Sequence, residues 1–228
     1  MKRLGTQYGG WVIPYPNKLN ENSIIYSAGV GEDISFDVKL QSLYNCNIFL
    51  IDPTVKAINH FDNVKKYFND KTFKISGGIQ PDYYENIHME NPDMSKFTYI
   101  NKGLWNTTDV LKFYRQTNEN YVSQSLIEGM FSTEYDTVRV DSIKNIMTEL
   151  GHKHIDLLKL DIEGAENIVL EQMLKDEIYP TYLCIEFDLL LKKKDRNNTT
   201  NIIVNKLLLY YNIIENDNLN VTFEIKTK

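Results

Sequence analysis

The strongest constraint on the fold is an alternation between short apolar runs and longer amphipathic stretches. Residues 24–28 and 48–51 are rich in β-branched and aromatic side chains, and DISFDVKLQSLY between them spaces its apolar residues along one helix face. Residues 155–160 form a further apolar run that leads through an acidic turn into an amphipathic stretch, and another run, TYLCIEFD, follows Pro180. Alternating strands and helices predict a mostly parallel, doubly wound α/β sheet covered on both faces.

Three further segments complete the expected sheet. KFTYINKGLW is typical of a strand that ends near Gly103, and the final LLLYYNIIENDNLNVTFEIK predicts two strands joined by an Asn-rich turn. Such a closing hairpin would place an antiparallel strand in the sheet. After IDPT, a helix is expected with Val55, Phe61 and Val64 on its apolar side and His60 on its polar side.

The chain is expected to form a single domain over residues 1–228, because 228 residues with 42% hydrophobic content can bury one core. Residues 1–22 form an N-terminal extension to the alternating pattern. Residues 69–96 and 106–138 are polar, aromatic-rich and weakly periodic, and they are too long for ordinary connections. We expect these two inserts to shape a substrate site.

Charge and composition exclude several classes of partner. The net charge is −6 and the Lys and Arg residues are scattered, which argues against nucleic-acid binding. No run reaches the roughly 18 apolar residues of a membrane span, and MKRLGTQYGGW lacks the apolar core of a signal peptide, so a cytoplasmic protein is expected. Cys46 and Cys184 fall in apolar runs and are expected to be small buried hydrophobes. A homo-oligomer is compatible with the sequence.

The stretch IIYSAGVGEDISF indicates a ligand-binding turn. Gly29 and Gly31 directly follow an apolar run, at the carboxyl edge of the sheet where open α/β folds bind ligands. A dinucleotide fingerprint would have a third glycine where this chain has Ile34. Glu32 and Asp33 would also repel a pyrophosphate. The turn is therefore either an ordinary tight turn or a site for a ligand without that group.

Asp52 ends the second apolar run, where a carboxylate can accept hydrogen bonds from both hydroxyls of a ribose. The alternative is that Asp52 only caps the helix that begins at Pro53. A ribose-binding Asp together with acids at the glycine turn suits a ligand with adenosine at one end and a cationic amino acid at the other. This description fits S-adenosylmethionine, whose positive charges Glu32 and Asp33 would attract.

The chain also resembles a known family. YGGWVIP, IIYSAGVGEDISFD, NIFLIDPT, NKGLWN, VDSIKNIMTELGHKHIDLLKLDIEGAE and LCIEFD are similar, in this order, to the FkbM-type S-adenosylmethionine-dependent methyltransferases. The resemblance covers most of residues 8–188. It implies the class I methyltransferase (Rossmann-like) fold, a mostly parallel seven-stranded sheet whose last strand is antiparallel. The family is associated with O-methylation, often of sugars or other small-molecule hydroxyls.

Site residues follow from the resemblance at matching positions. It implies that Gly29 and Gly31 form the turn under the methionine part of the cofactor, and that Asp52 binds its ribose. The methionine part would be bordered by Glu32, Asp33 and Phe36. The adenine would meet the backbone near Gly103 and Leu104.

Methyl transfer to a hydroxyl also requires a base. The candidates are Asp161, Glu163 and Glu186, at or near the carboxyl ends of expected central strands. Alternatively, Glu163 only interacts favourably with the dipole of the following helix, at its N-terminus. A further alternative is that two or three of these carboxylates hold a divalent cation such as Mg²⁺.

The resulting hypothesis is an O-methyltransferase that acts on a small molecule or glycan. The alternatives are a nicotinamide-dependent oxidoreductase on a related sheet and a cofactor-binding or interaction domain without turnover.

Overall fold

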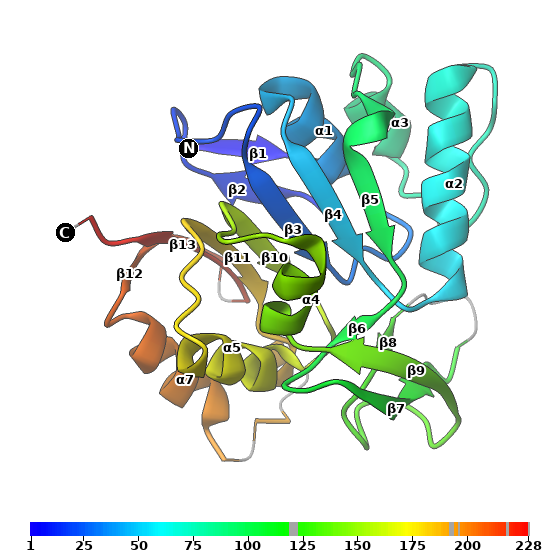
Figure 1. Ribbon diagram of the computed structural model, residues 1–228. Helices are drawn as coiled ribbons and strands as arrows, with labels where there is room; N and C mark the ends of the chain where they lie inside the picture. The colour runs from blue at the N-terminus through cyan, green and yellow to red at the C-terminus, as the bar shows by residue number, and fades with distance from the viewer. Residues whose placement is uncertain (119–122, 192–193, 196, 218, 228) are drawn as a thin grey trace.

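The computed structural model describes residues 1–118, 123–191, 194–195, 197–217 and 219–227, and its centre is a seven-stranded sheet (Figure 1). The strand order is β5-β4-β3-β10-β11-β13-β12. The first five strands in this order run parallel, and β13 is antiparallel to both of its neighbours. The mostly parallel sheet with an antiparallel last strand is therefore confirmed. The strands are β3 (Ile24–Ala28), β4 (Asn47–Ile51), β5 (Phe97–Ile100), β10 (Leu157–Leu160), β11 (Tyr182–Glu186), β12 (Tyr211–Asn216) and β13 (Asn220–Ile225).

Helices cover both faces of this sheet (Figure 1). One core packs around α1 (Ser35–Tyr44), α2 (Val55–Asn69), α3 (Tyr83–Ile87) and the hairpin of β1 (Lys2–Leu4) and β2 (Trp11–Ile13). The other packs around α4 (Ile143–Leu150), α5 (Glu166–Lys175) and α7 (Thr199–Leu207). Along β10, Leu157 belongs to the first core, and Leu158 and Leu160 belong to the second. This alternation places Lys159 on the α1 face of the sheet. The short segments η1 (Met94–Lys96) and α6 (Asp188–Leu191) complete the helical elements.

The third predicted strand is too long. The main sheet keeps β5 only to Ile100, and Gly103 belongs to a second, four-stranded sheet in the order β6-β9-β7-β8. The chain turns after Ile100, whose carbonyl accepts from the amide of Lys102, and Gly103 then pairs with Val140. Most of this sheet comes from the second insert. Its strands are β6 (Gly103–Leu104), β7 (Asp109–Arg115), β8 (Gln124–Ser125) and β9 (Tyr135–Asp141).

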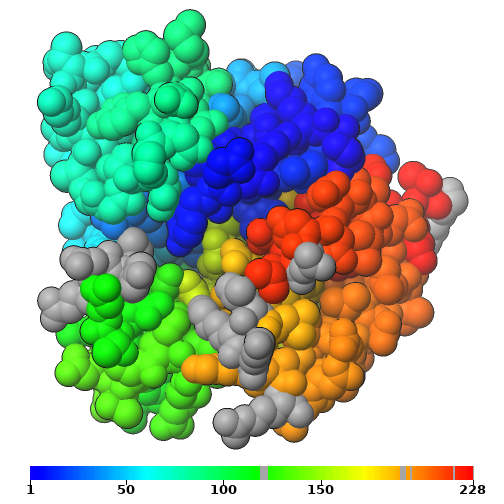
Figure 2. Space-filling view, turned by 180° about the vertical axis from the view of Figure 1, so that it is seen from behind, coloured from blue at the N-terminus to red at the C-terminus, as the bar shows by residue number. Residues whose placement is uncertain are grey.

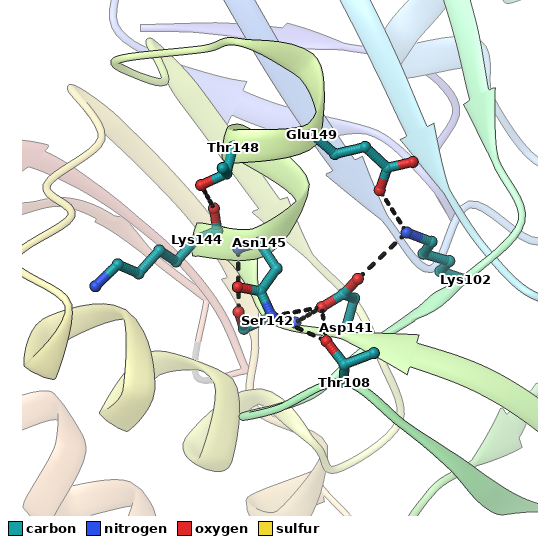
Figure 3. Close-up of polar contacts among 8 residues, drawn as sticks. All are labelled: Lys102, Thr108, Asp141, Ser142, Lys144, Asn145, Thr148 and Glu149. Carbon is teal, nitrogen blue, oxygen red and sulfur yellow. Dashed lines mark hydrogen bonds and ion pairs between the residues drawn. The ribbon is translucent and has the colours of Figure 1, made fainter.

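Hydrogen bonds of Asp141 connect the second sheet to α4 (Figure 3). One carboxylate oxygen accepts hydrogen bonds from Thr108 and Asn145, and the other accepts from Lys102 at 3.2 Å. The carbonyl of Asp141 accepts from the amide of Trp105 at 2.9 Å, directly after β6. These contacts fix the position of Gly103 and Leu104 at the edge of the main sheet.

The first insert packs on α1 and α2. Tyr83 and Ile87 of α3 are fully buried in the first core. The hydroxyl of Tyr83 lies 2.8 Å from Nε2 of His60, and His60 itself is buried. The prediction that His60 lies on the polar side of its helix is therefore wrong, because the ring lies inside the core and Tyr83 of the insert contacts its Nε2 there. Cys46 and Cys184 are free and buried, as expected.

Candidate functional site

A cavity of about 300 Å³ opens at the carboxyl ends of β3, β4 and β10. The N-terminal segment, both inserts and the turns after these strands contribute to its wall. Figure 2 shows the N-terminal segment, in blue, lying directly beside the first insert, in cyan and green. Nine of the eleven predicted site residues line this cavity: Gly29, Gly31, Glu32, Asp33, Asp52, Gly103, Leu104, Asp161 and Glu163.

The glycine turn needs glycine at Gly29. Gly29 has φ +70°, and a Cβ there would lie 1.6 Å from the carbonyl oxygen of Asp161. The amide of Asp161 also donates to the carbonyl of Ala28 at 3.2 Å. The turn after β3 and the turn after β10 are thus packed backbone against backbone, at a distance that excludes any side chain.

Asp52 lies between the glycine turn and α2. Its Oδ2 accepts from the amide of Gly31 at 3.0 Å, and its Oδ1 accepts from the amide and hydroxyl of Thr54 at 2.8 and 2.6 Å. The side chain that caps α2 is Thr54, whose hydroxyl accepts from the amide of Ala57. Burial raises the pKa of Asp52, and the hydrogen bonds from Thr54 and Gly31 oppose this effect. Asp52 therefore orders the loop but is not the helix cap itself, and Oδ2 retains a second lone pair toward the cavity.

Glu32 and Asp33 connect the glycine turn to the surrounding segments. Asp33 is buried and accepts from the hydroxyl of Thr6 at 2.5 Å and from the amide of Ser35 at 2.9 Å. Glu32 accepts from the amide of Gly78 in the first insert at 3.0 Å. The two acids therefore hold the N-terminal segment and the first insert against the turn.

The turn after β10 carries two of the predicted acids. Glu163 has φ +57°, an uncommon conformation for a residue with a side chain. Its carbonyl accepts at 2.6 Å from the hydroxyl of Ser125, a buried residue of the second insert. Glu166 accepts from the amides of Ile162 and Gly164 at 3.0 and 3.1 Å, and burial and then Asp188 raise its pKa well above the ordinary value. Strained backbone held by surrounding contacts is frequent at functional sites.

Glu186 lies at the end of β11 and is not among the lining residues. Burial first, and then the charges of Asp161 and Asp188, raise the pKa of Glu186 to about 8. Tyr8 also lines the cavity, and the same acids act on its phenol although the residue is 71% exposed. Partial desolvation of its phenol, followed by the charges of Asp161, Glu163 and Glu186, raises the pKa of Tyr8 to about 12. The three predicted acids thus act on one region.

Apolar side chains form the opposite wall. Leu104 follows Gly103 in β6, and Phe113 and Leu126 come from the second insert. Ile51 and Pro53 complete this surface beside Asp52. The cavity therefore has carboxylates along the strand ends and an apolar wall toward the second sheet.

The structure places Phe36 outside the cavity. It is buried in the first core, in α1, and does not border the glycine turn's open side. Conversely, the sequence hypothesis did not include Tyr8 or Lys159, which both line the cavity. The lysine within the apolar run LLKL was a usable signal, because a buried cation is costly unless it is paired. Tyr8 gave no comparable local signal.

No three His, Cys, Asp or Glu side chains of the described residues are grouped so that they could hold a metal ion. Within the same residues, no helix combines the length and apolar character needed to cross a bilayer.

The fold and the cavity define a mixed α/β protein with a ligand site at the carboxyl edge of its sheet. The model of the methyltransferase FkbM domain matches residues 6–189, and the chain belongs to this family. Family membership indicates a methyltransferase. Neither the comparison with curated proteins nor that with solved structures found a match.

Proposed function

We propose that the protein is an S-adenosylmethionine-dependent O-methyltransferase that acts on a hydroxyl of a small molecule or glycan. The observation that carries this proposal is the convergence on one cavity of a glycine turn, the Asp52 carboxylate and the acids of the turn after β10. The seven-stranded sheet with its antiparallel last strand agrees with the class I methyltransferase fold. Family membership supports the methyl-transfer chemistry.

The groups in the cavity suit this cofactor. The apolar wall of Ile51, Leu104, Phe113 and Leu126 can take a flat adenine, close to the backbone of Gly103. Asp52 presents a carboxylate to the ribose hydroxyls, through lone pairs that Gly31 and Thr54 do not use.

The cationic end of the cofactor would lie at the glycine turn. Both carboxylate oxygens of Asp33 accept hydrogen bonds, from Thr6 and Ser35. Glu32 accepts from Gly78 through Oε2, and Asp161 contacts Lys159 through Oδ2, so each has a second oxygen for an ammonium group. An attraction between opposite charges about 4 Å apart is worth roughly 4 kcal/mol near a protein surface. The same acids would repel a pyrophosphate. In addition, Ile34 is a buried core residue at the position where a dinucleotide site would have its third glycine.

When bound, S-adenosylmethionine supplies a methyl group on a sulfonium. The protein must hold the acceptor oxygen in line with that group and accept the hydroxyl proton, and positioning alone can contribute on the order of 7–11 kcal/mol. Of the three candidate bases, Asp161 and Glu163 line the cavity, where an acceptor hydroxyl would lie. Glu186 does not line it, and burial and then the charges of Asp161 and Asp188 raise its pKa to about 8.

The two inserts would shape the acceptor site. Gln80 of the first insert and Gln124 of the second line the cavity and offer amide groups for hydrogen bonds to hydroxyls. Tyr8 adds an aromatic surface at the mouth, which suits the apolar face of a sugar ring.

Titration calorimetry with S-adenosylhomocysteine and with NAD tests the proposal. We expect saturable heat with the former and none with the latter. Asp52→Ala should abolish S-adenosylhomocysteine binding, and Glu186→Gln should retain most of it. Absence of heat with S-adenosylhomocysteine for the wild-type protein would refute the proposed function.

Asp70→Ala is the matched control for Asp52→Ala. Asp70 accepts from the amide and hydroxyl of Thr72 at 2.9 and 2.7 Å, the same local arrangement as Asp52 with Thr54, but it is exposed and does not line the cavity. We expect Asp70→Ala to leave binding unchanged. Equal losses in the two variants would contradict a specific ribose contact by Asp52.

A further inference from the structure

Lys159 is buried in the middle of the main sheet. Only 5% of the residue is exposed, and it is the one lysine or arginine of the described residues that is buried to this degree. It occupies the third position of β10, between two leucines of the opposite core. Burial of a cation is costly unless hydrogen bonds and opposite charges compensate it, so its contacts should explain its presence.

These contacts join the two turns that form the floor of the cavity. The ammonium donates to the carbonyl of Gly29 at 2.7 Å and lies 3.4 Å from Oδ2 of Asp161. Gly29 and Asp161 are the residues whose backbones approach too closely for a Cβ. Lys159 therefore bonds to both sides of this approach, from below the cavity.

The charge of Lys159 acts on several acids from separate elements. They are Asp37 of α1, Asp52 at the end of β4, Asp161 after β10 and Glu186 at the end of β11. Burial raises the pKa values of Asp37 and Glu186, to about 6 and about 8, and the charge of Lys159 opposes both shifts. The buried positive charge thus compensates a group of carboxylates that no single element could hold together.

We propose that Lys159 is a positioning residue that holds the glycine turn and the Asp161 turn in register. The inference rests on the proposed function in so far as the two turns take the methionine end of the cofactor. Because in-line transfer depends on close alignment, a loosened contact between the turns would weaken cofactor binding and turnover.

Lys159→Met tests this role, since methionine keeps the length of the side chain but loses its charge and donors. Leu158→Ala is the control: the neighbouring residue in β10 is fully buried in the opposite core, so its truncation weakens the same strand without touching either turn. Both variants are compared at a temperature well below their unfolding midpoints. Should Lys159→Met not fold, Lys159→Gln, which keeps a donor without the charge, replaces it.

Two measurements are made on each variant. Hydrogen exchange of the ligand-free protein should be faster in residues 29–33 and 161–164 of Lys159→Met, and unchanged there in Leu158→Ala. Affinity for S-adenosylhomocysteine should fall at least about tenfold in Lys159→Met and less than about threefold in Leu158→Ala.

The outcomes separate this inference from the proposed function. Unchanged exchange in both turns of Lys159→Met would overturn the positioning role, and so would equal effects of the two variants. If the wild-type protein did not bind S-adenosylhomocysteine, the proposed function would fail, and the exchange measurement would still decide whether Lys159 holds the turns together.

Discussion

Replacement of Glu186 by glutamine should change how the stability of the protein depends on pH. The pKa of Glu186 is raised from an ordinary 4.5 to about 8, by burial first and then by the charges of Asp161 and Asp188. Between these two values the folded protein holds a proton that the unfolded chain releases. The free energy of unfolding must therefore fall as pH rises from about 5 to about 8, and level off above that.

The size of the effect follows from the same values. At about 1.36 kcal/mol per pKa unit, the increase from 4.5 to about 8 corresponds to at most about 5 kcal/mol of stability lost above pH 8. Glutamine has nearly the same shape and cannot ionise. Glu186→Gln should therefore match the wild-type protein near pH 5 and exceed its stability near pH 9, by up to that amount.

Urea unfolding at pH 5 and pH 9 measures this difference directly, because it needs neither cofactor nor acceptor. Glu85→Gln serves as the control, since Glu85 is exposed on α3, far from β11 in the sequence and on another element. It should reproduce the wild-type pH dependence. If Glu186→Gln also reproduced it, the proton would reside on another group.

Three further outcomes follow from the site. Gly29→Ala should abolish S-adenosylhomocysteine binding and cost well over about 2 kcal/mol of unfolding free energy, because strain at φ +70° is joined by a clash between the new Cβ and the carbonyl oxygen of Asp161, only 1.6 Å apart. Gly151→Ala, at φ +72° with nothing within 4 Å of its Cβ, should show only the strain of about 1–2 kcal/mol in urea unfolding. Ser125→Ala should cost about 1–3 kcal/mol of unfolding free energy, because the carbonyl of Glu163 loses a buried donor, whereas Ser132→Ala, at a half-buried residue whose hydrogen bond is exposed, should cost less than about 1 kcal/mol. Calorimetry in EDTA and in Mg²⁺ should give S-adenosylhomocysteine affinities within about twofold, since the proposed contacts to the cofactor are made by Asp52 and the glycine turn themselves, and a larger difference would indicate a cation in the site.

Periodicity predicted most of the main sheet because its central strands β3, β10 and β11 are nearly continuous buried runs, and helices cover them. The prediction was wrong at Gly103, because pairing with a distant strand places this residue in the second sheet. Gly103 and Leu104 pair with Val140 and Asp141, which are far along the chain, and no local pattern distinguishes this pairing from a continued β5. The prediction for His60 was wrong for a related reason, because its partner Tyr83 belongs to an insert without clear periodicity.

The candidate site was predictable where its residues directly follow a strand. Gly29, Asp52 and Asp161 each end an apolar run, and the parallel order of β3, β4 and β10 brings these ends to one edge. Tyr8 could not be found in this way. It reaches the cavity because Thr6 bonds to Asp33, a contact between the N-terminal segment and the glycine turn that only the folded chain reveals.

The acids at the glycine turn have a structural consequence besides the proposed attraction of a cationic ligand. Asp33 binds the N-terminal segment through Thr6, and Glu32 binds the first insert through Gly78. Carboxylates that only attracted a ligand could remain in solvent, whereas these form part of the wall that they help to close. A charge-assisted hydrogen bond is roughly twice as strong as a neutral one. Neutral residues at these positions would therefore weaken the contacts to Thr6 and Gly78 and would also remove the negative charge of the turn. The negative charge that distinguishes this turn from a phosphate-binding loop therefore also assembles the cavity around it.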